Sequence, residues 1–129
     1  MKQLLILTAL LIAGIFANAQ KVELLYFKAN LPCCPARACN ALESDIQSIL
    51  EESFDSETVI FKQVLLADAS NKSLVDKYNA KSQTVVLVKN SGGEEKLVDA
   101  SSQVRAYMRS NDKAKLKAEL TAMLNELEK

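Results

Sequence analysis

The chain contains no histidine, and this absence excludes two kinds of site. A cysteine–histidine nucleophile pair cannot form, and no metal ion can be held by imidazole nitrogens. Proline is scarce: the chain has only Pro32 and Pro35, and no proline occurs after Pro35. Cysteine occurs three times, and Cys33, Cys34 and Cys39 all lie within one short stretch. Any reactive side-chain chemistry is therefore expected from sulfur at this one place.

An excess of positive charge is also missing. The chain has 16 basic and 16 acidic residues, and without Lys2 the basic count falls by one. No basic stripe is present, so nucleic acid and anionic membrane surfaces are not expected partners. Internal repeats, low-complexity tracts and linkers are absent, which favours one domain with a modest core.

The N-terminal apolar run, from Leu4 to Phe16, is shorter than the roughly 20 residues that cross a bilayer as a helix. It follows Lys2 and precedes Ala17-Asn18-Ala19, an A-x-A cleavage pattern. We predict a cleaved signal peptide over residues 1–19 and a mature domain over residues 20–129. An uncleaved membrane anchor is the competing interpretation. The mature protein is then expected in the periplasm or secreted.

Export places the thiols where disulfides persist. An odd number of cysteines leaves one free, paired between chains or bound to a metal. The predicted state is therefore a monomer or a disulfide-linked dimer.

Hydrophobic patterns divide the mature sequence into strands and helices. We predict strands at Val22–Phe27, Thr58–Leu66, Thr84–Val88 and Lys96–Val98, with a turn at 90–93. Helices are expected after the cysteines, after a cap at Ser70 or Asn71, and from Val104 onward with an interruption at 110–112.

This order, βαβαββα, requires an α/β fold with a four-stranded mixed sheet. Right-handed crossovers place the first and third strands centrally, with helices on both faces. Sites in such sheets lie at the carboxyl ends of central strands. The cysteine loop leaves the first strand at that end.

The local sequence favours a reactive thiol at Cys34. Pro35 suits the first position of a helix, which would make Cys34 the N-cap. Unpaired backbone N–H groups and the positive Arg37 would then stabilise its thiolate. Cys33 is equally accessible and less favourably placed.

Cys34 as the attacking thiol and Cys39 as the buried resolving thiol are the favoured pair. In a regular helix their Cα atoms would lie about 8 Å apart, whereas a disulfide needs about 4.4–6.8 Å. Either the helix begins later, near Ala38, or the pair closes only with a rearrangement. A Cys33–Cys34 disulfide fits the spacing but is strained.

Across the mature chain the strand, cysteine loop and βαββα remainder resemble a thioredoxin-fold protein. More closely, four segments resemble a small exported thioredoxin-like family named for a nitrophenyl-compound (arsenical) nitroreductase subunit (ArsF-like). They are Leu25–Phe27, Cys39–Glu43, Asn71–Tyr78 and Gln83–Val88. The resemblance implies electron transfer, with a DsbD-like membrane thiol reductase or another redox protein as partner.

The sequence departs from this family at three positions. The C-x-x-C motif aligns its second cysteine with Cys39 and its first with Ala36, so Cys33 or Cys34 must substitute from upstream. The cis-proline that faces the dithiol aligns with Thr84, and the buried acid before the motif aligns with Asn30.

The leading hypothesis is a thiol-based redox carrier without a cofactor, either a thiol–disulfide oxidoreductase or a reductase subunit. Cys34 attacks, Cys39 resolves, and Cys33 tunes the site or forms a mixed disulfide. The alternatives are binding of Cu(I), As(III) or Zn(II) by the three thiolates, and a redox-inactive interaction module.

Overall fold

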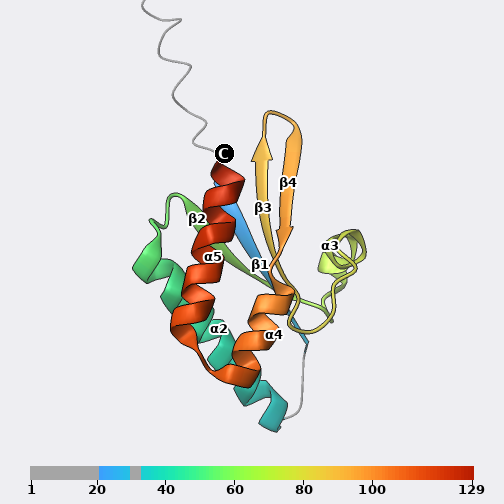
Figure 1. Cartoon of the computed structure of the whole chain (residues 1–129). Helices are drawn as coiled ribbons and strands as arrows, with labels where there is room; N and C mark the ends of the chain where they lie inside the picture. The colour runs from blue at the N-terminus through green and yellow to red at the C-terminus, as the bar shows by residue number, and fades with distance from the viewer. Residues whose placement is uncertain (1–20, 30–32) are drawn as a thin grey trace, which may run out of the picture.

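The structure is a computed structural model that describes residues 21–29 and 33–129, with the backbone alone for residues 33–39. The predicted signal peptide lies outside the described residues. The elements, shown in Figure 1, are β1 (Val22–Lys28), α2 (Cys33–Ser53), β2 (Val59–Leu65), the 3₁₀ turn η1 (Ala69–Asn71), α3 (Lys72–Lys77), β3 (Val85–Ser91), β4 (Glu94–Asp99), α4 (Ser101–Ser110) and α5 (Lys113–Glu128).

The four strands form one mixed sheet in the order β2-β1-β3-β4. β1 pairs with β2 in parallel and with β3 antiparallel, and β3 and β4 form an antiparallel hairpin. The prediction that the first and third strands are central is confirmed. The carboxyl end of β1 therefore lies beside the carboxyl end of β2 and the amino end of β3.

The central strand β1 is buried on both faces, which explains its continuous apolar run. Because side chains alternate along a strand, Val22, Leu24 and Tyr26 enter the core under α2, α4 and α5. Leu25 and Phe27 enter a smaller core against α3. Figure 1 shows α2, α4 and α5 together on one side, with α3 set apart.

Helices α2 and α5 pack on the sheet through the apolar stripes predicted for them. In α2 the buried residues are Leu42, Ile46, Ile49 and Leu50, and in α5 they are Leu116, Leu120, Leu124 and Leu127. Both stripes belong to one core cluster with β1 and β3. The helix that follows the cysteines is thereby fixed to the sheet along its described length.

The predicted start of α2 is wrong. α2 begins at Cys33, so Cys34 and Pro35 lie within its first turn, and a start near Ala38 is ruled out. Pro35 is compatible with this position because the first turn needs no intrahelical N–H donor there. Ahead of α3, Asn71 occupies one of the two predicted N-cap positions without a side-chain hydrogen bond, and the Asp68 carboxylate caps the preceding turn η1 by accepting a hydrogen bond from the Ser70 N–H (2.9 Å).

The strands of the last hairpin and the helix α4 also extend further than predicted. β3 continues to Ser91 and β4 starts at Glu94, leaving Gly92 and Gly93 as the turn, with φ of 56° and 89°. α4 starts at Ser101 rather than Val104. Among the residues that the structure describes, no helix combines the length and apolar character needed to span a bilayer.

Candidate functional site

The cysteines lie at the start of α2, which four residues of the chain separate from the end of β1. Because α2 begins at Cys33, all three occupy its first two turns. Their side chains lie outside the described part of the structure. The pairing of Cys34 with Cys39 thus remains a prediction, as does the role of Arg37.

Thr84 lies beside the last residues of β1, at the same end of the sheet. The Phe27 N–H donates to the Thr84 carbonyl and the Gln83 N–H donates to the Phe27 carbonyl, both at 2.9 Å. Thr84 is buried, and its hydroxyl accepts a hydrogen bond from the Lys81 N–H (3.0 Å). The residue aligned with the cis-proline is therefore adjacent to the strand from which the cysteine loop leaves. No cis peptide bond occurs among the described residues.

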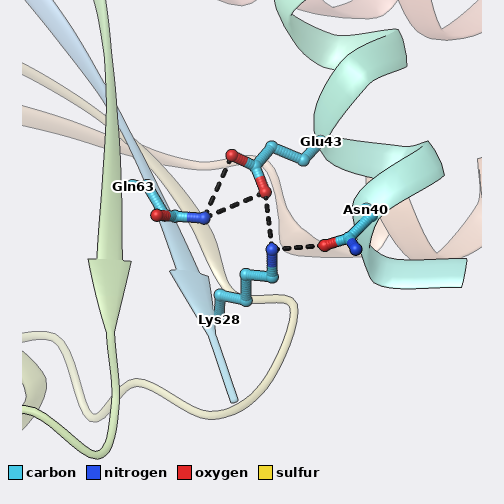
Figure 2. A network of polar contacts seen from close by, with 4 residues as sticks. All are labelled: Lys28, Asn40, Glu43 and Gln63. Carbon is cyan, nitrogen blue, oxygen red and sulfur yellow. Dashed lines mark hydrogen bonds and ion pairs between the residues drawn. The ribbon is translucent and has the colours of Figure 1, made fainter. Parts of the chain in front are cut away.

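A polar network joins β1, α2 and β2 next to the cysteine segment (Figure 2). The ammonium group of Lys28, the last residue of β1, donates to the side-chain amide oxygen of Asn40 (Oδ1) and lies 3.0 Å from Glu43 Oε2. Gln63 Nε2 of β2 donates to both Glu43 carboxylate oxygens at 3.0 Å. The Lys28 and Glu43 side chains are each 18% exposed, so this ion pair is partly shielded from water.

This network is not evident from the sequence. Lys28 and Glu43 are 15 residues apart, and Gln63 and Glu43 are 20 apart, so their contact depends on the crossover from β1 through α2 to β2. Two signals were present: a lysine that closes a buried strand, and a glutamate one helical turn after Cys39. They become meaningful only when the strand order is known.

A second polar contact joins α2 to α4. The Tyr107 hydroxyl donates to Asp45 Oδ2 at 2.5 Å. This hydrogen bond, followed by burial and the negative charge of Asp45, raises the pKa of Tyr107 to about 12. Tyr107 is only 8% exposed and belongs to the core. It holds the cysteine helix to α4 and supplies no proton near neutral pH.

Within the part of the chain whose side chains are described, no cluster of three acidic, cysteine or histidine residues could hold a metal ion. The three thiols of the metal-binding alternative lie outside that part. Chemically, the described residues around them offer one ammonium group, one carboxylate and two amides.

No protein-family model matches the chain, and no curated protein matches it either. Among solved structures, a thioredoxin of Trichomonas vaginalis is 25% identical, with a TM-score of 0.46, over 81% of this chain and 90% of that one. Thioredoxin-2, a component of the protein secretion machinery of the malaria parasite, is 23% identical, with a TM-score of 0.43, over 70% and 84%. A Thermus thermophilus thioredoxin is 16% identical, with a TM-score of 0.43, over 70% and 72%.

These similarities are to the backbones of thioredoxins. The fold assignment follows from the chain's own topology, namely the strand order β2-β1-β3-β4 and helices on both faces. The protein therefore has an α/β thioredoxin-like fold.

Proposed function

We propose that the chain is an exported thioredoxin-like redox protein that passes electrons by thiol–disulfide exchange through Cys34 and Cys39. The observation that carries this proposal is the position of all three cysteines in the first two turns of α2. That helix follows the central strand β1 directly, at the carboxyl end where sites of such sheets lie. Unpaired N–H groups of a helix start stabilise a thiolate there.

The exchange proceeds in two balanced steps. The Cys34 thiolate attacks a substrate disulfide, forming a mixed disulfide and releasing one substrate thiolate. The Cys39 thiolate then attacks the Cys34 sulfur and releases the second substrate thiolate. The substrate gains two electrons, the Cys34–Cys39 dithiol loses two, and the two thiol protons end on the substrate thiols. A dithiol of a DsbD-like membrane reductase returns the electrons by the reverse steps.

The helical backbone places a condition on this cycle. Since α2 is helical from Cys33, Cys34 and Cys39 are separated by about 8 Å between Cα atoms, too far for a disulfide. Oxidation must therefore unwind part of the first two turns. The reduced protein would keep the longer helix.

A glutathione redox titration, with alkylation and mass mapping of the sulfurs at each potential, tests the function. A reversible couple that includes Cys39 supports it. Three thiols that never pair would support metal or metalloid binding instead, and a disulfide that resists reduction would support a redox-inactive module. Turnover with a dithiol reductant should be lost in Cys34→Ser and retained in the matched variant Cys33→Ser.

The partner and the location are tested separately. In Cys39→Ser the mixed disulfide on Cys34 cannot be resolved, so it should trap the membrane thiol reductase or the substrate protein. The family resemblance supports such a partner and transfer toward a nitro-reducing or arsenical-reducing system. Expression with the leader in a Gram-negative bacterium should yield a periplasmic or secreted form starting at Gln20. A form that keeps Met1 would contradict cleavage.

A further inference from the structure

β2 forms one edge of the sheet, and in the described part of the chain no strand pairs with its outer side (Figure 1). The Val22 N–H of β1 donates to the Thr58 carbonyl at 3.0 Å, so the even-numbered residues along this strand turn their backbone groups toward β1. Phe61 and Gln63 therefore direct both the N–H and the carbonyl outward. No described turn or loop supplies a backbone partner for these groups.

The two edges of the sheet differ in the charge that they carry. β4, at the opposite edge, has charged side chains at four of its six positions, namely Glu94, Glu95, Lys96 and Asp99. Charged side chains are one means by which edge strands are kept from pairing with other chains. The one charged side chain on β2 is Lys62, and its ammonium group is held 2.7 Å from Glu23 Oε1 on β1. The outer edge of β2 therefore lacks this protection.

An apolar cavity of about 210 Å³ lies beside this edge, between β2 and the last turns of α2. Leu50 and Phe54 of α2 and Val59 and Phe61 of β2 form its apolar lining. Small-molecule sites usually span about 300–1,000 Å³, so a cavity of this size suits a single side chain. Side chains of an added strand would alternate between the two faces of the sheet. One that lies on the α2 side, opposite Phe61, would enter the cavity.

The rim of the cavity is acidic. Glu51 lines it, Asp55 and Glu57 follow in the connection to β2, and all three side chains are exposed. Among the residues with described side chains, none of these three carboxylates forms an ion pair. Charge complementarity therefore favours a partner that carries lysine or arginine next to the side chain in the cavity.

We propose that the outer edge of β2 and this cavity together bind an extended segment of a partner protein, with an apolar side chain in the cavity and basic residues two positions to either side. The segment would add a strand to the sheet. Main-chain hydrogen bonds to Phe61 and Gln63 would supply affinity, and the cavity with its acidic rim would select the side chains. This site contains no cysteine, so it goes beyond the proposed redox function and does not depend on it.

The test uses the reduced protein and a fluorescein-labelled peptide, Thr-Lys-Thr-Phe-Thr-Lys-Thr, whose phenylalanine and lysines share one face of a strand. Fluorescence anisotropy should show saturable binding that weakens with added salt. Replacing the phenylalanine by alanine should weaken binding about tenfold. Replacing both lysines by glutamate should also weaken it. In the complex, amide hydrogen exchange should slow at Phe61 and Gln63 and change little at Lys62, whose N–H faces β1.

Two pairs of variants test the edge and the rim separately. Gln63→Pro removes the outward N–H and no hydrogen bond to β1, and should weaken binding about tenfold. Gln63→Ala loses the same side-chain contact with Glu43 but keeps the N–H, and should bind like the unsubstituted protein. Glu51→Lys should weaken binding about threefold, whereas Glu94→Lys, on the opposite edge strand, should not. If Gln63→Pro does not fold, the amide exchange at Phe61 and Gln63 decides.

Equal binding by Gln63→Pro and Gln63→Ala would overturn the proposal, as would the absence of binding at about 1 mM peptide. Sedimentation of the free protein tests a second copy as the occupant. A dimer that Gln63→Pro dissociates, without binding of the peptide, would assign the edge to another copy of this chain and reject the partner segment. Peptide binding without a reversible disulfide couple would leave this site standing while the redox function fails.

Discussion

Ser101 secures the amino end of β3, next to Thr84. Its hydroxyl accepts a hydrogen bond from the Val85 N–H at 3.0 Å, and both residues are buried. Its own N–H donates to Asp99 Oδ1 at 2.8 Å. One small side chain thus joins the start of β3 to the start of α4.

Ser101→Ala should lower the free energy of unfolding by about 1–3 kcal/mol, because the Val85 N–H loses its partner inside the core. Urea unfolding followed by circular dichroism measures this. Ser102→Ala, an exposed position in the same helix, is the control and should change stability by less than about 0.5 kcal/mol. Equal effects at both positions would show that the buried hydrogen bond contributes little.

Tyr107 should titrate at very high pH. Its pKa of about 12 in the folded protein lies above the ordinary tyrosine value of 10.0, so folding favours the neutral phenol. This contribution to stability is complete below pH 10.0 and is lost as the pH rises toward 12. In Asp45→Asn the hydroxyl loses its charged partner, and its pKa should fall toward the ordinary value.

Ultraviolet titration of the phenolate measures the Tyr107 pKa, with Tyr107→Phe as the control that identifies its signal among the three tyrosines. The same titration in Asp45→Asn should show one tyrosine moving to lower pH. No change between the two titration curves would mean that Asp45 does not control this group.

At the scale of elements, the junction of α4 and α5 depends on Asn111. This residue has a left-handed conformation with φ of 56°, and its N–H donates to the Tyr107 carbonyl at 2.7 Å. The next residue, Asp112, caps α5 by accepting a hydrogen bond from the Lys115 N–H at 3.0 Å. Two adjacent residues therefore end one helix and start the next.

Asn111→Ala should destabilise the protein by about 1 kcal/mol, because a left-handed backbone is costly for a residue with a Cβ and no local side-chain hydrogen bond. Asn111→Gly should have a much smaller effect. Asn125→Ala, the same change at an exposed interior position of α5, should stabilise slightly, since alanine is the better helix former. Thermal unfolding compares the three, and the same sign at 111 and 125 would contradict the backbone explanation.

The strands and the long helices could be predicted because each carries its own hydrophobic period. The buried stripe through Ile46 in α2 and the continuous apolar run of β1 are examples. The start of α2 was misplaced because the position of Pro35 within a first turn fits several registers. Asn71, one of the two residues predicted to cap α3, is its N-cap, whereas the turn η1 with its own cap at Asp68 was not predicted, because Asp68, Ser70 and Asn71 are all good capping residues.

At the scale of the molecule, the core is shared between the sheet and three helices. Leu120 of α5 is fully buried in the cluster that also contains Leu24 and Ile46. Leu120→Ala should therefore lower the free energy of unfolding by about 2–5 kcal/mol through lost burial and a residual cavity.

Leu97→Ala makes the same change on the edge strand β4, where the side chain is 47% exposed, and should cost about 1 kcal/mol or less. Denaturant unfolding of the two variants measures the difference. Similar losses at both sites would show that α5 adds little to the core.

The whole-molecule order of strands was predictable because crossover handedness leaves few arrangements. The side-chain contacts between elements could not be predicted, and the Lys28–Glu43 pair is the clearest case. The sequence indicates which residues are charged, but which charges meet depends on the register between a strand and a helix. The thioredoxin-like fold could therefore be derived before the structure, whereas the charged surroundings of the cysteine helix could not.

The side chains of Lys28 and Asn40, which are 12 residues apart, form a hydrogen bond that joins the two ends of the segment carrying the cysteines. A chain segment fixed at both ends can change shape only between its fixed points. If oxidation unwinds the start of α2, the unwinding should stop at Asn40, where the anchored part of the helix begins. The sheet and its core would then keep one conformation throughout the redox cycle. Amide hydrogen exchange should differ between the oxidised and the reduced protein for residues before Asn40 and should be the same for residues after it.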